Sequence, residues 1–172
     1  MSAPYYRAMG NPFRPRTLHD ATARRTEPIA VVEAFLGSLA AADVESTSEL
    51  LDEHVTWVNV GLPAIRGRRR TMAVLRSLGW PGRSFEVYLH AIAANGVTVL
   101  TERTDVLVFG RCRVQLWVVG RFDVQDGRIT LWRDSFDYLD ALRATLRGLL
   151  GALVPAWQPT APGSPDVAPG RH

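Results

Sequence analysis

Four long strand-like runs, joined by turns of two residues, constrain the fold of this chain more than any other feature. In chain order, the runs and the turns between them are 85–94, Asn95-Gly96, 97–109, Gly110-Arg111, 112–124, Asp126-Gly127 and 128–136. Such dipeptides favour tight hairpins, in which a central residue takes a positive φ. Runs that are joined in this way pair antiparallel, so the sequence predicts a long antiparallel meander.

Helical patterns precede and follow the meander. Before it, we expect a helix from an N-cap at Thr26 to about Ala42, a short helix near 47–51, a strand over 55–60 and a helix over 70–78. A closing amphipathic helix is expected over about 137–153. Helices followed by an antiparallel meander favour an α+β fold over a parallel α/β fold. A strongly curved mixed or antiparallel sheet that cups three to four helices would enclose one deep cavity.

The length of 172 residues and the apolar content of 47% fit one globular domain. The two ends are rich in Pro and Arg and show no hydrophobic periodicity. We therefore expect disordered tails at residues 1–25 and 155–172, and a folded domain over residues 26–154.

Charge and composition exclude several classes of partner. The net charge is +3 and every basic residue is Arg, but these are scattered rather than gathered on one face, so no nucleic-acid partner is expected. No apolar run reaches the roughly 18 residues that a membrane span needs, and the N-terminus lacks the apolar core of a secretory signal. These patterns predict a cytoplasmic protein without a membrane span.

Cysteine and histidine usage gives no metal motif. Cys112 is the only cysteine, and the four histidines show no HxH or HxxxH spacing. The sequence therefore predicts no metal site.

Arg103 and Asp105 lie two residues apart in a strand, so their side chains share one face with Val99 and Leu107. A buried face does not hold ionised groups unless they are paired and hydrogen-bonded. Asp134 is the expected third member of this charged group, because the same alternation places it on one face of its strand with Trp132 and Phe136. An Arg between two carboxyl groups in an apolar pocket can separate their pKa values, which suits general acid and base catalysis.

Three segments together resemble the active-site segments of the limonene-1,2-epoxide hydrolase family. They are Trp57-Val58-Asn59, Leu100 to Leu107, and Trp132-Arg133-Asp134-Ser135-Phe136-Asp137. The resemblance covers about residues 28–150 and is closest to the branch of the family that acts on bulky lipid or sterol epoxides. It implies the cone-like fold of nuclear transport factor 2 and ketosteroid isomerase, and an enzyme that uses neither metal nor cofactor.

The resemblance also implies a role for each polar residue. Asp134 would remove a proton from a water molecule while Asn59 accepts its second hydrogen. Asp105, held protonated, would give its proton to the epoxide oxygen, and Arg103 would bridge the two carboxyl groups. The single concerted step would convert an epoxide to a vicinal diol without a covalent intermediate.

Trp57 departs from the family pattern, in which a Tyr helps to hold the water. The indole Nε1–H of Trp57 can donate a hydrogen bond to the water oxygen but cannot accept one. Trp132 is expected to be a core aromatic residue.

The family motifs, combined with the alternation of side chains along the strands, predict an apolar wall around the substrate. Its members come from two helices and the sheet: Leu36, Leu39, Leu78, Leu107, Leu116, Val118 and Phe136. Such a wall fits a terpene, sterol or fatty-chain epoxide.

Two other functions stay open at the level of the sequence, because one fold can host several activities. The first is an isomerase or polyketide-type cyclase, and the second is a small-ligand binding module. Family analogy further predicts a homodimer.

Overall fold

The computed structural model of the chain describes residues 28–78 and 83–153, except for the side chain of Leu78. The predicted tails and the expected N-cap at Thr26 lie outside the described residues. In chain order the elements are α1 (Pro28–Ala40), α2 (Val44–Glu49), β1 (Leu51–Asn59), β2 (Ile65–Arg66), α3 (Arg68–Leu78), β3 (Arg83–Asn95), β4 (Thr98–Phe109), β5 (Cys112–Gln125), β6 (Arg128–Ser135) and α4 (Tyr138–Leu153).

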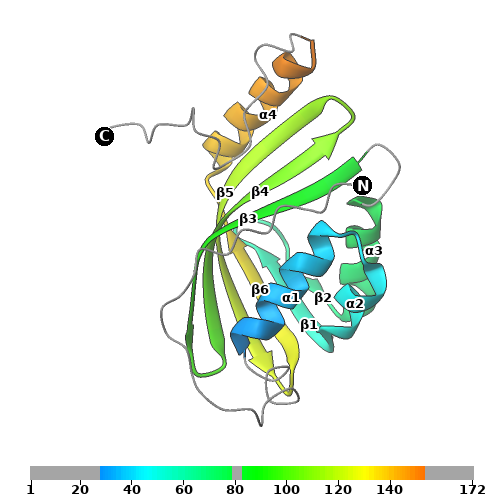
Figure 1. Ribbon diagram of the computed structural model, residues 1–172, viewed down its shortest axis with the longest axis vertical. Helices are drawn as coiled ribbons and strands as arrows, with labels where there is room; N and C mark the ends of the chain where they lie inside the picture. Colours follow the sequence, from blue (N-terminus) through cyan, green and yellow to red (C-terminus); the bar gives the residue numbers. More distant parts are fainter. Residues whose placement is uncertain (1–27, 79–82, 154–172) are drawn as a thin grey trace, which may run out of the picture.

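The strands form one mixed sheet with the order β2-β1-β6-β5-β4-β3 (Figure 1). The four strands from β3 to β6 make the predicted antiparallel meander, and β1 adds to it in parallel with β6. The predicted α+β class and the predicted meander are both confirmed, with strand ends within about two residues of those expected.

The turns and one irregularity shape the sheet. Asp126 and Gly127 have φ values of 49° and 73°, as a tight hairpin with two left-handed residues requires. The pairing of β3 with β4 shifts between Leu89 and Ala91, which leaves His90 as an extra residue. A bulge of this kind bends a strand and increases its twist, and so contributes to the curvature of the sheet.

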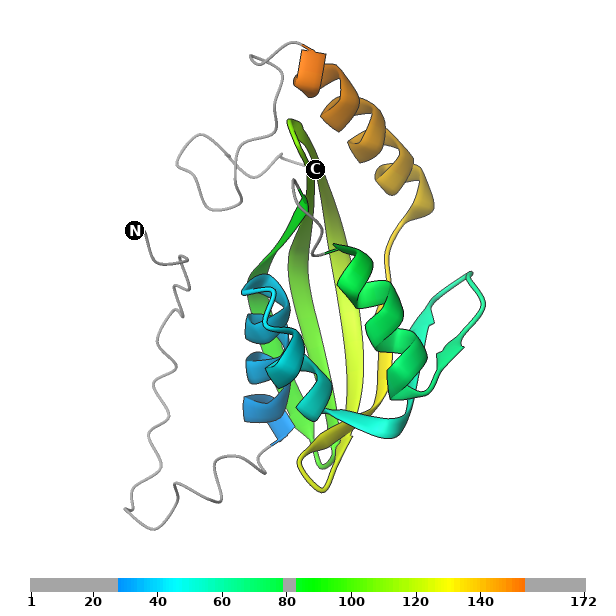
Figure 2. The same ribbon diagram turned by 90° about the vertical axis from the view of Figure 1, so that its right-hand side faces the viewer.

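Helices α1, α2 and α3 lie together against the sheet, whereas α4 lies apart from them and packs along β5 (Figures 1 and 2). The buried side of α1 presents Val32 and Phe35, and the ring of Phe35 meets Phe122 and Trp132 edge-on. Further core members come from α1, β1, α3 and the sheet: Val31, Leu36, Leu51, Val55, Met72, Leu75, Val99, Val124 and Ile129. The core thus lies between α1–α3 and the sheet.

The elements before the meander differ from the prediction in three places. Helix α2 begins earlier than expected, because the side chain of Asp43 accepts a hydrogen bond from Ser46 N and caps it. As a result β1 starts at Leu51 rather than at residue 55. The two-residue strand β2, which pairs with β1, was not predicted.

Within the described ranges, every helix is too short or too polar to span a membrane.

Candidate active site

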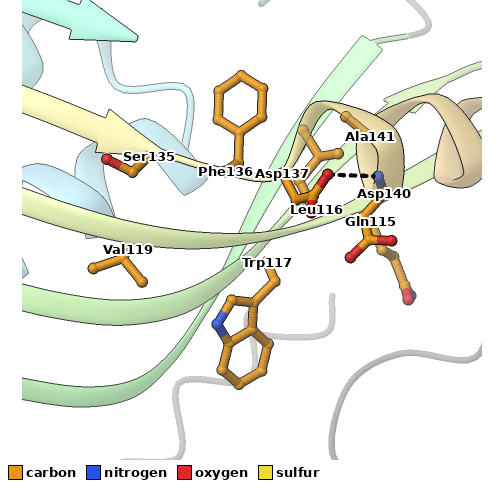
Figure 3. A pocket seen from close by; sticks show the side chains of 9 residues that line it. All are labelled: Gln115, Leu116, Trp117, Val119, Ser135, Phe136, Asp137, Asp140 and Ala141. Carbon is orange, nitrogen blue, oxygen red and sulfur yellow. Dashed lines mark hydrogen bonds between the residues drawn. The ribbon is translucent and has the colours of Figure 1, made fainter. Parts of the chain in front are cut away.

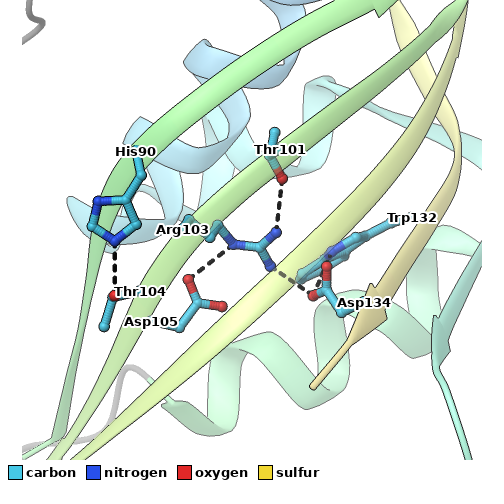
Figure 4. A network of polar contacts seen from close by, with 7 residues as sticks. All are labelled: His90, Thr101, Arg103, Thr104, Asp105, Trp132 and Asp134. Carbon is cyan, nitrogen blue, oxygen red and sulfur yellow. Dashed lines mark hydrogen bonds and ion pairs between the residues drawn. The ribbon is translucent and has the colours of Figure 1, made fainter. Parts of the chain in front are cut away.

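Arg103 lies between two carboxyl groups on the face of the sheet that α1–α3 cover. Its Nε donates to Asp105 Oδ1 at 2.9 Å, and its Nη2 donates to Asp134 Oδ2 at 2.8 Å (Figure 4). The third nitrogen, Nη1, donates to Thr101 Oγ1 at 3.1 Å. The Arg103 side chain is fully buried, and its guanidinium carbon lies 5.8 Å from the centroid of the Phe122 ring. All three guanidinium nitrogens are therefore held.

Gly120 is the reason that Arg103 can reach across a strand. Asp105 and Arg103 belong to β4, Asp134 belongs to β6, and β5 runs between them. Gly120 is the residue of β5 that is opposite Thr101 on one side and Asp134 on the other. A Cβ atom on Gly120 would lie 2.3 Å from Arg103 Nη1. The guanidinium thus occupies the space that a side chain would fill.

Burial dominates the electrostatics of this network. It raises the pKa of Asp105 to about 6, although the nearby Arg103 charge and its hydrogen bond act in the opposite direction. It raises the pKa of Asp134 as well, against Arg103 and a hydrogen bond from Trp132. Burial alone would lower the pKa of Arg103, but the two carboxylates outweigh it and the pKa is raised. The network therefore holds a fixed positive charge between two acids that retain protons more readily than ordinary aspartates.

Two stacked indole rings, Trp132 and Trp57, belong to this region, and Trp132 contacts Asp134 directly. Trp132 Nε1 donates to Asp134 Oδ2 at 2.8 Å, and Trp57 stacks on the Trp132 ring. Among the described residues, two buried atoms here have no hydrogen-bond partner, Trp57 Nε1 and Asp134 Oδ1. An unpaired buried donor or acceptor is unfavourable by about 1–3 kcal/mol. A small polar molecule such as water can satisfy a buried donor or acceptor of this kind.

Asn59 comes to the site through the parallel pairing of β1 with β6. It is opposite Asp134, and Trp57 is opposite Trp132, so the two pairs lie on the same face of the sheet. The structure therefore brings Asn59, Trp57, Arg103, Asp105 and Asp134 into one region, from three different strands.

The residues predicted to line the substrate pocket do not all share one hollow. Leu39 lines a hollow of about 170 Å³ between α1, α2, α3 and the start of β3, together with Met72, Leu75 and Phe85. Leu116 and Phe136 line another hollow, of about 340 Å³, beside the first turn of α4 (Figure 3).

The other predicted pocket residues have separate environments. Leu36 is buried in the core, and Val118 is buried opposite Arg103. Leu107 is half-buried. The side chain of Leu78 lies outside the described part of the structure.

Sequence reasoning missed three residues of the network. Thr101 shares the face of Arg103, so the alternation along the strand could have identified it. Gly120 interrupts a strand-like run, which is a known signal of a close approach to the backbone. Trp132 is a core residue, as predicted, but it also donates a hydrogen bond to Asp134, which no pattern in the sequence indicates.

Solved structures with little sequence similarity to this chain have a similar fold. A protein from Xanthomonas campestris pv. campestris described as a polyketide cyclase superimposes with a TM-score of 0.63 over 71% of this chain and 98% of its own. The two sequences are 19% identical, so this likeness concerns the fold alone.

Closer similarity is found among epoxide hydrolases. Epoxide hydrolase EphG from Mycobacterium tuberculosis is 49% identical over 130 residues, which make up 75% of this chain and 86% of EphG. The structure of an LEH-like epoxide hydrolase from M. tuberculosis superimposes with a TM-score of 0.75, at 48% identity, over 79% of this chain and 96% of its own. Residues 26–147 match the limonene-1,2-epoxide hydrolase catalytic domain. The chain therefore belongs to the limonene-1,2-epoxide hydrolase family and carries an epoxide hydrolase domain of that type.

Proposed function

We propose that this protein converts an apolar epoxide to a vicinal diol by direct attack of water, with Asp134 as general base and Asp105 as general acid. The observation that carries the proposal is the position of Arg103, whose guanidinium bonds both carboxyl groups at 2.8 and 2.9 Å in a buried site. Two acids that share one fixed cation can differ in protonation, which concerted acid and base catalysis requires.

The reaction balances without a further reagent. The water oxygen attacks an epoxide carbon as Asp134 takes one of its protons. The bond between that carbon and the epoxide oxygen breaks, and the oxygen takes the proton of Asp105. The product is a diol, and the enzyme is left with Asp134 protonated and Asp105 ionised. One proton must then move from Asp134 to Asp105 before the next turnover.

The two unpaired buried atoms support the placement of the attacking water at Asp134. Asp134 Oδ1 is the acceptor that remains after Oδ2 has bonded Arg103 and Trp132. Trp57 Nε1 is a donor that can point to the water oxygen. Asn59, opposite Asp134 in the parallel pair, can accept the second hydrogen through its amide oxygen. Together these groups would orient one lone pair of the water toward the substrate.

The substrate class follows from the surroundings of the acids. Asp105 lies opposite Val87 on β3 and Leu116 on β5, and Leu107 follows on the same face. A hydrocarbon body fits such apolar neighbours, whereas a sugar would leave its hydroxyl groups unpaired. We therefore propose a terpene, sterol or fatty-chain epoxide.

A single-turnover assay in oxygen-18 water tests the reaction and the mechanism together. A panel from limonene oxide to a sterol 5,6-epoxide is incubated with excess enzyme, and the diol is analysed by mass spectrometry. Direct attack places solvent oxygen in the diol during the first turnover. A covalent ester would instead deliver an oxygen atom of the protein.

The variants Asp134→Asn and Asp105→Asn identify the two acids, because each retains the size of the side chain and loses the proton chemistry. We expect each to lower kcat by at least about a hundredfold. Full activity in either variant would overturn its assignment. No turnover of any epoxide by folded wild-type protein would reject the hydrolase proposal and favour an isomerase, a cyclase or a binding module.

A further inference from the structure

A group of arginines lies where the short strand β2 meets helix α3. The basic residues are scattered over the chain as a whole, but here Arg66, Arg68, Arg69 and Arg70 fall within one short segment. All four line a hollow of about 390 Å³ beside β1, and Glu53 is the one acid among its lining residues. This part of the surface therefore has a strong positive charge. We call the four arginines the basic surface.

The backbone at Gly67 explains why these side chains meet. Its φ of 86° lies in the left-handed region that favours glycine. Its N–H donates to Val55 O at 2.8 Å, and its carbonyl oxygen accepts from Arg70 N at 3.1 Å. The chain thus passes from β2 into α3 at a single residue, which brings Arg66 of the strand close to the arginines of the helix.

The positions of these arginines do not serve the stability of the fold. Three of them begin α3, which has no acidic residue, and the helix dipole disfavours positive charge at this end. The side chain of Arg68 donates to Leu51 O at 3.3 Å. Arg66, Arg69 and Arg70 are exposed, and none of them forms an ion pair with another residue of the described ranges. Charges that oppose local stability are typical of a surface that meets a partner.

Exposed apolar residues lie near the basic surface. Val60 and Leu62, in the turn between β1 and β2, are 37% and 54% exposed. Val74 is 39% exposed and lies one helical turn beyond Arg70 on the same side of α3. Strands β1 and β2 contact α3, and the three elements lie on one side of the molecule (Figure 2). Basic side chains next to a few exposed apolar ones are typical of proteins that rest on anionic membranes.

We propose that the basic surface docks this protein on a lipid bilayer that contains anionic phospholipids. The phosphate groups of such lipids accept hydrogen bonds from guanidinium groups, and their charge complements the basic surface. Docking needs no change of the fold, because Met72 and Leu75 of α3 stay in the core. The proposal goes beyond the proposed function and agrees with it, since an apolar epoxide concentrates in lipid.

A nucleic acid is the other polyanion that a basic surface could bind. Proteins that hold single strands add aromatic side chains on which the bases stack. The described lining of the hollow includes His54 but no Phe, Tyr or Trp. The exposed side chains of Leu62 and Val74 also have no counterpart in a phosphate backbone. The observations therefore favour a bilayer.

Cosedimentation of the full chain with lipid vesicles tests the proposal. Vesicles of phosphatidylcholine alone are compared with vesicles that contain about one third phosphatidylglycerol. We expect binding to the mixed vesicles only, because only these have a negative surface. The binding should be lost at about 1 M salt, where the screening length is about 3 Å.

Two pairs of substitutions locate the docking surface. Arg69→Gln combined with Arg70→Gln should weaken binding to the mixed vesicles about twentyfold, since each arginine near such a surface contributes about fivefold. Arg143→Gln combined with Arg147→Gln is the matched control, because it removes the same charge from exposed positions of α4. This control should bind like the wild type.

A third pair, Arg69→Lys with Arg70→Lys, tests the kind of contact. Lysine keeps the charge but cannot bond a phosphate group through two parallel N–H groups. A bilayer offers many mobile headgroups, so we expect this variant to retain its binding to the mixed vesicles. Loss of binding would indicate a discrete phosphate site and contradict the proposal.

Hydrolysis is measured separately from docking. With a dissolved epoxide and no vesicles, the glutamine variant of Arg69 and Arg70 should keep the wild-type kcat, because neither residue belongs to the acid network. Vesicle binding by a chain that hydrolyses no epoxide would reject the proposed function and still support the docking surface.

Four further results would overturn the proposal. The first is a wild-type chain that does not bind the mixed vesicles. The second is equal binding to phosphatidylcholine alone, which would indicate apolar adsorption. The third is an equal loss of binding in the α4 control. The fourth is tighter binding to single-stranded DNA than to the mixed vesicles, lost in the glutamine variant of Arg69 and Arg70.

Discussion

Trp57 and Trp132 lie face to face, with ring centroids 4.4 Å apart and ring planes only 9° from parallel. They come from the parallel strands β1 and β6, in directly opposite positions. The two stacked indoles differ in their hydrogen bonds. Trp132 Nε1 donates to Asp134, whereas Trp57 Nε1 has no partner among the described residues. Trp132 therefore positions the proposed base, and the Nε1–H group of Trp57 can still donate a hydrogen bond.

Replacing Trp57 tests whether its unused donor acts in catalysis. Trp57→Tyr restores the family residue and retains a hydrogen-bond donor, so we expect kcat within a few-fold of the wild type. Trp57→Phe retains an aromatic ring but has no donor, and should lower kcat about tenfold or more. Steady-state kinetics of the two variants with one epoxide gives the comparison. Equal activity of Phe and Tyr variants would show that the donor has no part.

Replacing Trp132 should change the pH dependence of the reaction. The hydrogen bond from Trp132 favours the ionised form of Asp134 and so lowers its pKa. In Trp132→Phe that effect is lost, so the pKa of Asp134 rises and the acidic limb of the rate profile moves to higher pH. The measurement is kcat/KM against pH. Trp117→Phe, on an exposed ring outside the network, should leave the acidic limb in place.

Asp105 should set the alkaline limb of the same profile. A general acid must be protonated, and burial raises the pKa of Asp105 to about 6. We therefore expect kcat/KM to fall about tenfold per pH unit above that value. A profile that stays flat between pH 6 and pH 8 would contradict this role.

The raised pKa of Asp105 also predicts how stability changes with pH. Between about pH 4 and pH 6 the folded protein holds a proton on Asp105 that the unfolded chain has lost, so stability falls as pH rises through this window. Asp105→Asn cannot ionise and should lack this loss, which is on the order of 2–3 kcal/mol. Urea unfolding of both proteins at pH 4 and pH 7 measures the difference, because these values bracket the window. The opposite sign would indicate that Asp105 is ionised favourably in the fold.

Gly120 should tolerate no side chain. In Gly120→Ala the new methyl group would lie 2.3 Å from Arg103 Nη1 and 2.5 Å from Thr101 Oγ1, and Arg103 is fully buried. We expect a loss of about 1–3 kcal/mol in the free energy of unfolding, with a larger relative loss of kcat because both acids lose their common partner. Gly37→Ala is the control, since a methyl group on Gly37 would enter open space and alanine favours a helix.

The alternation of side chains made the face shared by Arg103 and Asp105 predictable, and the two-residue turns made the meander predictable. Both predictions rest on residues that are close together in the sequence. The pairing of Asn59 with Asp134 could not be read from local patterns, because it joins strands 75 residues apart through a parallel contact. For the same reason, Asn59 could be assigned only through the family resemblance.

The reversed packing of α4 shows where periodicity misleads. The leucines of residues 139–153 predict an amphipathic helix, which the structure confirms. The pattern also suggests that these leucines face the core, but they do not, because Gly148 allows the opposite side of α4 to approach β5 more closely. The orientation of α4 depends on the close approach of Gly148 to the backbone of β5. A pattern of apolar residues in the sequence carries no information about such a contact.

The parallel pairing of β1 with β6 has a consequence for folding order. The hairpins of the meander can form from residues that are close in the chain, whereas β1 must close a loop that contains nearly all of the intervening domain. We therefore expect Arg103, Asp105 and Asp134 to come together when the meander forms. Asn59 and Trp57 join them only when β1 has paired with β6. During refolding, recovery of catalysis should lag behind formation of the sheet and report the completion of the native topology.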